Sequence, residues 1–115
     1  MTEPSNAEKH AVIAAKVWPD AVLGGYSKQV CILESETKGR WFNLLATNPD
    51  GSPTIQAKAD AIDTSAELSI NFYRAKSGKW VATLVTKDGR IIITDEYDTY
   101  CEAIFNAAWE VCRER

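Results

Sequence analysis

The sequence predicts an α+β fold: a six-stranded antiparallel meander sheet flanked by a short N-terminal helix and a longer C-terminal helix. Three observations predict it. Apolar residues recur at three- and four-residue spacing near both ends, the middle of the chain alternates with a period of two, and short turns rich in glycine, asparagine and aspartate interrupt that middle part. Turns this short cannot hold a crossover helix, so successive strands must run antiparallel.

Length and composition predict one compact domain over residues 1–115. The chain has 115 residues, of which 45% are apolar and 25% charged, a balance typical of globular proteins. Its net charge of −3 argues against a protein that mainly holds nucleic acid, because such domains are usually basic. The polar N-terminus has no apolar run behind it, and no stretch approaches the ~20 apolar residues of a membrane span. We therefore expect a cytoplasmic protein with no membrane partner.

The first helix is expected at about residues 6–18. Ser5 and Glu8 have the spacing of a capping box, and the residue before Pro19 resists helical backbone angles. Residues 20–27, which include a Gly-Gly pair, are expected to form a connector. The expected core stripe consists of Ala11, Ala14, Ala15 and Trp18.

Alternating segments predict the strands within about residues 28–96. Thr54–Ile62 shows the clearest alternation, with alanines at every second position. The pattern does not decide which face of the sheet the helices cover, because the set around Val81 is nearly as apolar as the set around Trp80. The expected strands are Gln29–Glu36, Trp41–Thr47, Thr54–Ile62, Leu68–Tyr73, Trp80–Val85 and Arg90–Asp95.

The second helix is expected at about residues 97–113, and it is apolar around more than half of its circumference. Such a helix must be covered on two sides, by the sheet and by either the N-terminal helix or a second copy of the protein. A homodimer through Phe105 and Trp109 is one alternative. The two apolar stripes are Tyr97, Cys101, Ile104, Ala108 and Val111, and Phe105, Trp109 and Cys112.

Residue types suited to catalysis or metal binding are scarce. His10 is the one histidine, and the neighbouring sequence supplies neither a nucleophile nor a positioned partner for it. Cys31, Cys101 and Cys112 lack the spacing of a zinc site and are expected to be buried apolar residues. We therefore expect no catalytic residue, no metal and no cofactor, and a protein that is not an enzyme.

Charge is distributed unevenly along the chain. Residues 74–90 hold five basic residues and one acidic residue, whereas residues 91–115 hold two basic and six acidic residues. In a single meander the turns near residues 38–40 and 87–90 would lie at the same end of the sheet. Lys38, Arg40, Lys87 and Arg90 would then form a basic rim, which favours phosphate contacts with single-stranded nucleic acid or RNA.

The sequence favours a non-enzymatic binding module that docks on another protein or macromolecular assembly, as an adaptor, inhibitor or accessory protein. The scarcity of catalytic residues and the uneven charge, which steers encounters, support this interpretation. Binding of nucleic acid through the basic rim is the alternative, and a small enzyme or ligand carrier comes third. The expected contacts on the open sheet face are Trp41, Tyr73, Arg74 and Trp80.

Overall fold

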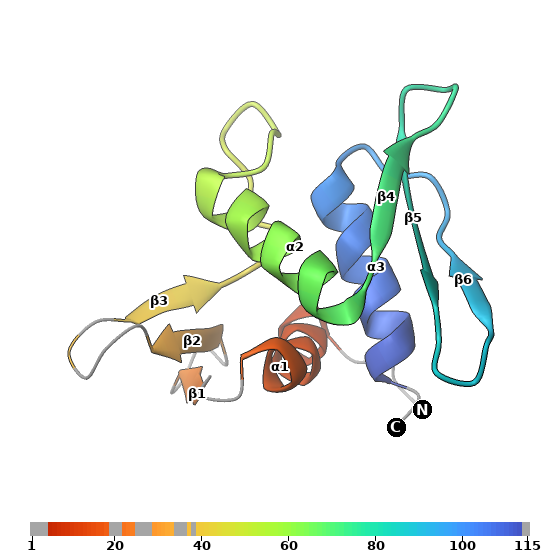
Figure 1. Cartoon of the computed structure of the whole chain (residues 1–115). Coiled ribbons are helices and arrows are strands. Elements are labelled where there is room, and N and C mark those ends of the chain that lie inside the picture. Colours follow the sequence, from red (N-terminus) through yellow and green to blue (C-terminus); the bar gives the residue numbers. More distant parts are fainter. Residues whose placement is uncertain (1–4, 19–21, 25–28, 34–36, 38, 114–115) are drawn as a thin grey trace.

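The computed structural model describes residues 5–18, 22–24, 29–33, 37 and 39–113. Helices and strands alternate in groups along the chain (Figure 1). In order they are α1 (Asn6–Val17), β1 (Val22–Gly24), β2 (Gln29–Leu33), β3 (Gly39–Phe42), α2 (Ile55–Leu68), β4 (Asn71–Arg74), β5 (Trp80–Val85), β6 (Ile91–Ile93) and α3 (Tyr100–Cys112). The class is α+β, as the sequence predicts.

The strands form two sheets, so the prediction of one six-stranded meander is wrong. In the described part of the chain, β1–β2–β3 and β4–β5–β6 are separate three-stranded antiparallel sheets. Helix α2 joins them, and they lie on different sides of the helices in Figure 1. No strand continues the first sheet into the second because the segment expected to do so is helical.

Helix α2 occupies the segment that the sequence predicts to be a strand, Thr54–Ile62. Thr54 caps it, with its side-chain oxygen accepting a hydrogen bond from the backbone N–H of Ala57 at 3.1 Å. Ala57, Ala61 and Thr64 are buried at four- and three-residue spacing, which is the helical period. Alanine favours helices and is depleted in strands, so the alternating alanines were the misleading signal.

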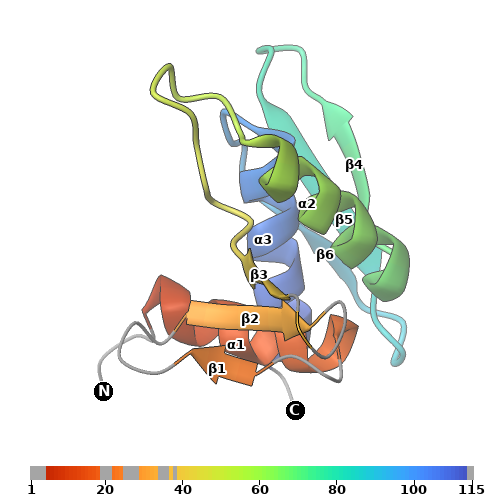
Figure 2. The same ribbon diagram turned by 90° about the vertical axis from the view of Figure 1, so that its left-hand side faces the viewer.

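The first sheet also departs from expectation. Strand β1 falls within the connector predicted for residues 20–27 and pairs with β2 through Leu23 and Val30. Strand β3 ends at Phe42, whereas a strand was predicted to continue to Thr47. Helix α1 packs against β2, so this sheet and α1 form one side of the molecule (Figure 2).

The two terminal helices lie where the sequence predicts helices, because their caps are encoded locally. Ser5 accepts a hydrogen bond from the N–H of Glu8 at 3.2 Å, as the capping-box spacing predicts. In α3, Thr99 accepts from the N–H of Glu102 at 3.2 Å, and the side chains of these two residues also hydrogen-bond at 3.3 Å. This cap starts α3 at Tyr100, three residues later than predicted.

The two hairpins of the second sheet form as the turn residues predict. Arg74 pairs with Trp80 across the first hairpin and Val85 with Ile91 across the second. Gly89 has φ of 88° in the second turn, a conformation that favours glycine.

Helix α3 lies at the centre of the core. It packs against α1 and α2 on one side and chiefly against β5 on the other. These elements supply the two covering layers that its wide apolar surface requires. The buried cluster comprises Ile13, Ala14, Phe42, Leu44, Ala61, Ile70, Ala82, Leu84, Cys101, Ala103, Ile104, Phe105, Ala107, Ala108 and Cys112.

Candidate docking surface on the second sheet

The inner face of the β4–β5–β6 sheet packs onto α3. Strand register and alternation place the side chains of Phe72, Trp80, Ala82, Leu84 and Ile92 on this face, and all five belong to or pack against the core cluster. The ring of Phe72 stacks on that of Tyr100 in α3, with centroids 5.2 Å apart. The structure thus settles which face the helices cover, a point that the sequence pattern left open.

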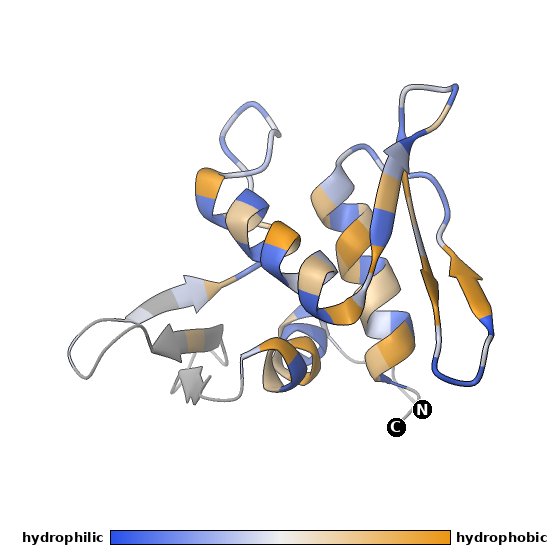
Figure 3. Cartoon of the chain, in the orientation of Figure 1, coloured by the Kyte–Doolittle hydropathy of each residue, from blue (hydrophilic) through white to orange (hydrophobic). Residues whose placement is uncertain are grey.

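The opposite face, here called the outer face, carries large exposed apolar side chains. Ile91 is 69% exposed, Ile93 65%, Val85 63% and Tyr73 49%. Val81 lies at the centre of the same face and is buried. Strand β6 is hydrophobic along its length and the turn that precedes it is hydrophilic (Figure 3). No described helix packs against the outer face.

Strand β6 also presents main-chain groups that face no other described strand. The Thr94 N–H donates to the Ala82 carbonyl at 3.0 Å, and the Thr86 N–H donates to the Arg90 carbonyl at 2.8 Å. Main-chain groups point toward and away from a neighbouring strand at alternate residues, so those of Ile91 and Ile93 point away from β5. We call this side of β6 the β6 edge. Among the described residues no strand pairs with it.

A polar pocket of about 360 Å³ lies beside the β6 edge, between β6 and α3. Two carboxylates, of Asp95 and Glu110, give it an acidic lining. Their effect is visible at Tyr97, whose pKa is raised by burial first and then by the negative charges of Asp95, Glu102 and Glu110. The pocket is lined by Ile91, Ile92, Ile93, Thr94, Asp95, Tyr97, Asn106 and Glu110.

The structure separates the four contacts predicted for the open sheet face. Trp41 is exposed but belongs to β3 in the first sheet, and only Tyr73 lies on the outer face of the second. Trp80 is half-buried on the inner side, and the guanidinium of Arg74 lies 5.8 Å from the centroid of its ring. Trp80 and Arg74 therefore do not form one surface with Tyr73, and Trp41 is elsewhere.

The predicted basic rim requires one sheet, and the structure has two. Lys38 lies outside the described residues, and of Arg40 only the backbone, in β3, is described. Lys87 and Arg90 are exposed in the turn between β5 and β6, which lies at the other side of the molecule from the start of β3 (Figure 1). Arg90 also pairs with Asp88 at 3.1 Å.

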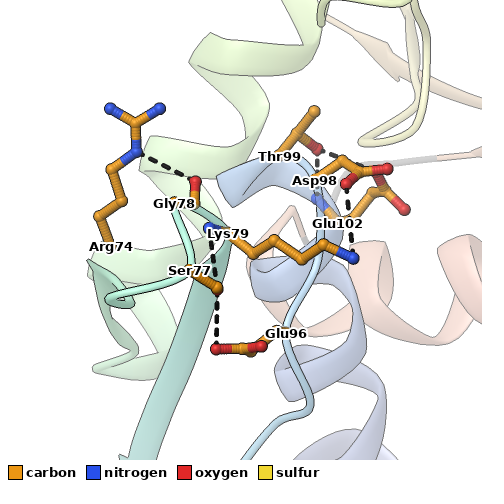
Figure 4. A network of polar contacts seen from close by, with 8 residues as sticks. All are labelled: Arg74, Ser77, Gly78, Lys79, Glu96, Asp98, Thr99 and Glu102. Carbon is orange, nitrogen blue, oxygen red and sulfur yellow. Dashed lines mark hydrogen bonds and ion pairs between the residues drawn. The ribbon is translucent and has the colours of Figure 1, made fainter.

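The basic segment, residues 74–90, and the acidic segment, residues 91–115, contact each other at the end of the second sheet that holds the turn between β4 and β5 (Figure 4). Ser77, in the turn between β4 and β5, donates a hydrogen bond to Glu96 at 3.0 Å, and Lys79 lies 4.0 Å from Asp98. Arg74 donates to the carbonyl of Gly78 at 3.1 Å. These exposed contacts contribute little to stability, but they neutralise part of the charge difference seen in the sequence.

The predicted dimer face of α3 is largely inside the molecule. Phe105 is 3% exposed and belongs to the core, so it is not available to a partner. Trp109 is half-buried, and the ammonium group of Lys9 in α1 lies 5.6 Å from its ring centroid. Helix α1 thus covers this side of α3, which is the first of the two alternatives that the sequence left open.

His10 is buried and held by the main chain at both ring nitrogens. Its Nδ1–H donates to the Asn6 carbonyl at 2.7 Å, and its Nε2 accepts from the N–H of Leu44 at 2.9 Å. The ring packs between Phe42 and Phe105. Burial lowers the pKa of His10, and the hydrogen bond to Asn6 opposes this only in part. The side chain therefore joins α1 to the segment after β3.

The described cysteines are not arranged for chemistry. Burial raises the pKa of Cys101 and of Cys112 to about 11, so both thiols stay protonated at neutral pH. Cys31 is half-buried, a small departure from the expected burial. Within the described ranges no group of three or more His, Cys, Asp or Glu residues could hold a metal ion, and no helix is long and apolar enough to cross a membrane.

A second hollow, of about 280 Å³, lies between the segment after β3 and the start of α3. Its polar lining includes Thr99 and Glu102, which already hydrogen-bond to each other as the cap of α3. The Cys101 thiol at its wall is buried and protonated. Nothing in this hollow converges on a ligand, so the outer face and the β6 edge are the stronger candidate.

Comparison with known proteins identifies no relative: no family model, no curated protein and no solved structure matches the chain. The function is therefore argued from the residues. Sequence reasoning missed the β6 edge, and the run Ile91-Ile92-Ile93 was a signal only that this strand would expose apolar side chains. Successive side chains of a strand point to opposite faces of the sheet, so three consecutive isoleucines cannot all face the core. At least one of them had to lie on the opposite face.

Proposed function

We propose that the protein is a non-enzymatic docking module that binds an extended segment of another protein by adding it as a fourth strand beside β6. The observation that carries the proposal is the β6 edge itself, where the outward main-chain groups of Ile91 and Ile93 are flanked by exposed apolar side chains. Strand addition takes its affinity from main-chain hydrogen bonds and its specificity from alternate side chains.

The outer face alone is a small platform. Three strands about 4.8 Å apart and some five residues long cover roughly 240 Å². A specific interface buries about 800 Å² on each partner, so docking flat on this face would supply too little contact. A segment paired with the β6 edge contacts the outer face on one side and the pocket over α3 on the other, which enlarges the interface.

The two sides of the β6 edge define the chemistry of the segment. Its outward side chains would lie beside Ile91 and Ile93, which favours apolar or β-branched residues. Its inward side chains would enter the pocket containing Asp95 and Glu110, which favours lysine or arginine. The proposed occupant is therefore an extended segment that alternates apolar and basic residues.

A capture experiment with matched variants tests this proposal. The tagged protein, Ile93→Pro and Ile93→Thr are incubated in parallel with cell lysate, each with and without nuclease treatment. Proline removes an outward N–H without breaking the ladder to β5, whereas threonine keeps that N–H and the β-branched shape. We expect a stoichiometric protein to be retained by the original chain and by Ile93→Thr, and to be lost with Ile93→Pro.

The same experiment separates strand addition from the alternatives. Val85→Lys places a charge on the outer face away from the β6 edge, so loss of the partner with Val85→Lys but not with Ile93→Pro would contradict strand addition. Retained material that disappears on nuclease treatment, and that is released steeply by salt, would instead favour nucleic acid bound by Lys87 and Arg90.

A further inference from the structure

We infer that the β6 edge is self-complementary, so that two copies of this chain pair β6 with β6 in antiparallel orientation about a two-fold axis. This inference rests on the strand addition of the proposed function and takes the added strand from a second copy of this chain, which would compete with any other segment for the β6 edge. Residues 90–95 of the same chain meet part of the requirement for alternating apolar and basic residues: Ile91 and Ile93 supply apolar side chains on the outer face, Arg90 supplies one basic side chain, and Asp95 ends the segment with a carboxylate. One surface patch then supplies both halves of the contact.

Geometry selects a register for the pair. Within β6, Ile91 and Ile93 direct main-chain groups away from β5, so the register that uses both residues pairs Ile91 of one copy with Ile93 of the other. The two-fold axis makes this pairing occur twice, and each pair exchanges two N–H···O bonds. The outer-face side chains of Ile91 and Ile93 then lie directly opposite each other, which removes the most exposed apolar surface of the sheet from water.

Charge favours the same arrangement. In this register Arg90 of one copy lies opposite Thr94 of the other and next to its Asp95 and acidic pocket. Within a single chain, Arg90 has an ion pair with Asp88 at 3.1 Å, and this pair contributes little because both side chains are more than half exposed. The basic start of each β6 thus meets the acidic end of the other, whereas a parallel arrangement would place like charges together.

The helices accommodate the pair. Helix α3 packs chiefly against β5, and the β5 strands of the two copies would be separated by three strand spacings, about 14 Å. Two helices of about 10–12 Å diameter fit at that separation with a narrow gap. Asn106 and Glu110 line the pocket on this side of α3, so polar side chains and water would fill the gap. The result is a closed pair, because the two β6 edges satisfy each other.

Sedimentation equilibrium over a wide concentration range, with the same variants, tests the inference. We expect the mass to rise from one chain to two with concentration, and Ile93→Pro to raise the dissociation constant about tenfold or more, while Ile93→Thr changes it less. Arg90→Glu is expected to weaken the pair, and adding Asp95→Lys to the same chain to restore it, because the two charges are then exchanged. Circular dichroism of each variant checks that it is folded.

Each outcome of these measurements supports or contradicts self-pairing, strand addition or both. A protein that stays a single chain at every concentration overturns self-pairing, and so does a dimer that is unaffected by both Ile93→Pro and Arg90→Glu. If the protein is a single chain yet captures a partner in a manner that depends on the Ile93 N–H, strand addition stands and only the second copy as occupant is wrong. If the β6 variants alter neither dimer nor capture, both proposals fall.

Discussion

Replacing His10 by alanine is expected to lower the free energy of unfolding by about 3–4 kcal/mol, because two costs add. The substitution removes a ring packed between Phe42 and Phe105, and it leaves the buried N–H of Leu44 without its acceptor. Denaturant unfolding followed by circular dichroism measures the change. His10→Gln is the matched control, because its side-chain oxygen can still accept from Leu44, and we expect it to lose less.

The same residue predicts how stability depends on pH. The pKa of His10 is lowered in the folded protein, so below about pH 6.5 the unfolded chain takes up a proton that the folded protein does not. Stability due to neutral His10 is therefore full above that pH and falls as the pH drops toward the folded pKa. We expect the free energy of unfolding to decrease between about pH 7 and 5 in the original chain and to stay nearly flat in His10→Gln. Identical pH profiles would contradict this role for His10.

Ala59→Pro is expected to cost about 3 kcal/mol or more, because Ala59 lies in the interior of α2. Its side chain is exposed, so the loss would come from the broken backbone hydrogen bond and the clash of the ring with the preceding turn. Thermal and denaturant unfolding measure it. This prediction tests the largest difference between the sequence-based fold and the structure.

A milder substitution at the same position distinguishes a helix from a strand by the sign of the change in stability. Valine is the poorer residue in a helix and the better one in a strand, so Ala59→Val should destabilise α2 by about 0.5 kcal/mol. A stabilising effect of Ala59→Val would argue for the strand that the alternating alanines predicted. Because Ala59 makes no core contact, packing does not obscure the comparison.

Local signals predicted the parts of the fold that depend on neighbouring residues. Ser5 with Glu8 located the start of α1, and the Asp88-Gly89 pair located the turn between β5 and β6. The error at α2 also arose locally: alternating alanines fit a strand, but the same residues place Ala57 and Ala61 on one helical face. Alanine propensity, given more weight than alternation, would have identified this helix.

The candidate site could be predicted only in part because it depends on which strand lies at an edge. Tyr73 and Trp80 were both named as contacts because both faces of β5 are apolar in sequence; in the structure Tyr73 is exposed, whereas Trp80 packs against the core. The role of Ile91 and Ile93 depends on the sheet ending at β6, and no sequence pattern states that. The premise of the basic rim was wrong for the same reason, since it assumed that all strands share one sheet.

The most direct test of the β6 edge is site-resolved amide hydrogen exchange at Ile91, Ile92 and Ile93. The N–H of Ile92 points toward β5, so it should be protected in every state, whereas those of Ile91 and Ile93 should exchange fast in a dilute single chain. We predict that Ile91 and Ile93 become protected when a partner or a second copy binds, and that Ile92 changes little. Binding that leaves the Ile91 and Ile93 amides exchanging as fast as before would contradict docking by strand addition at β6.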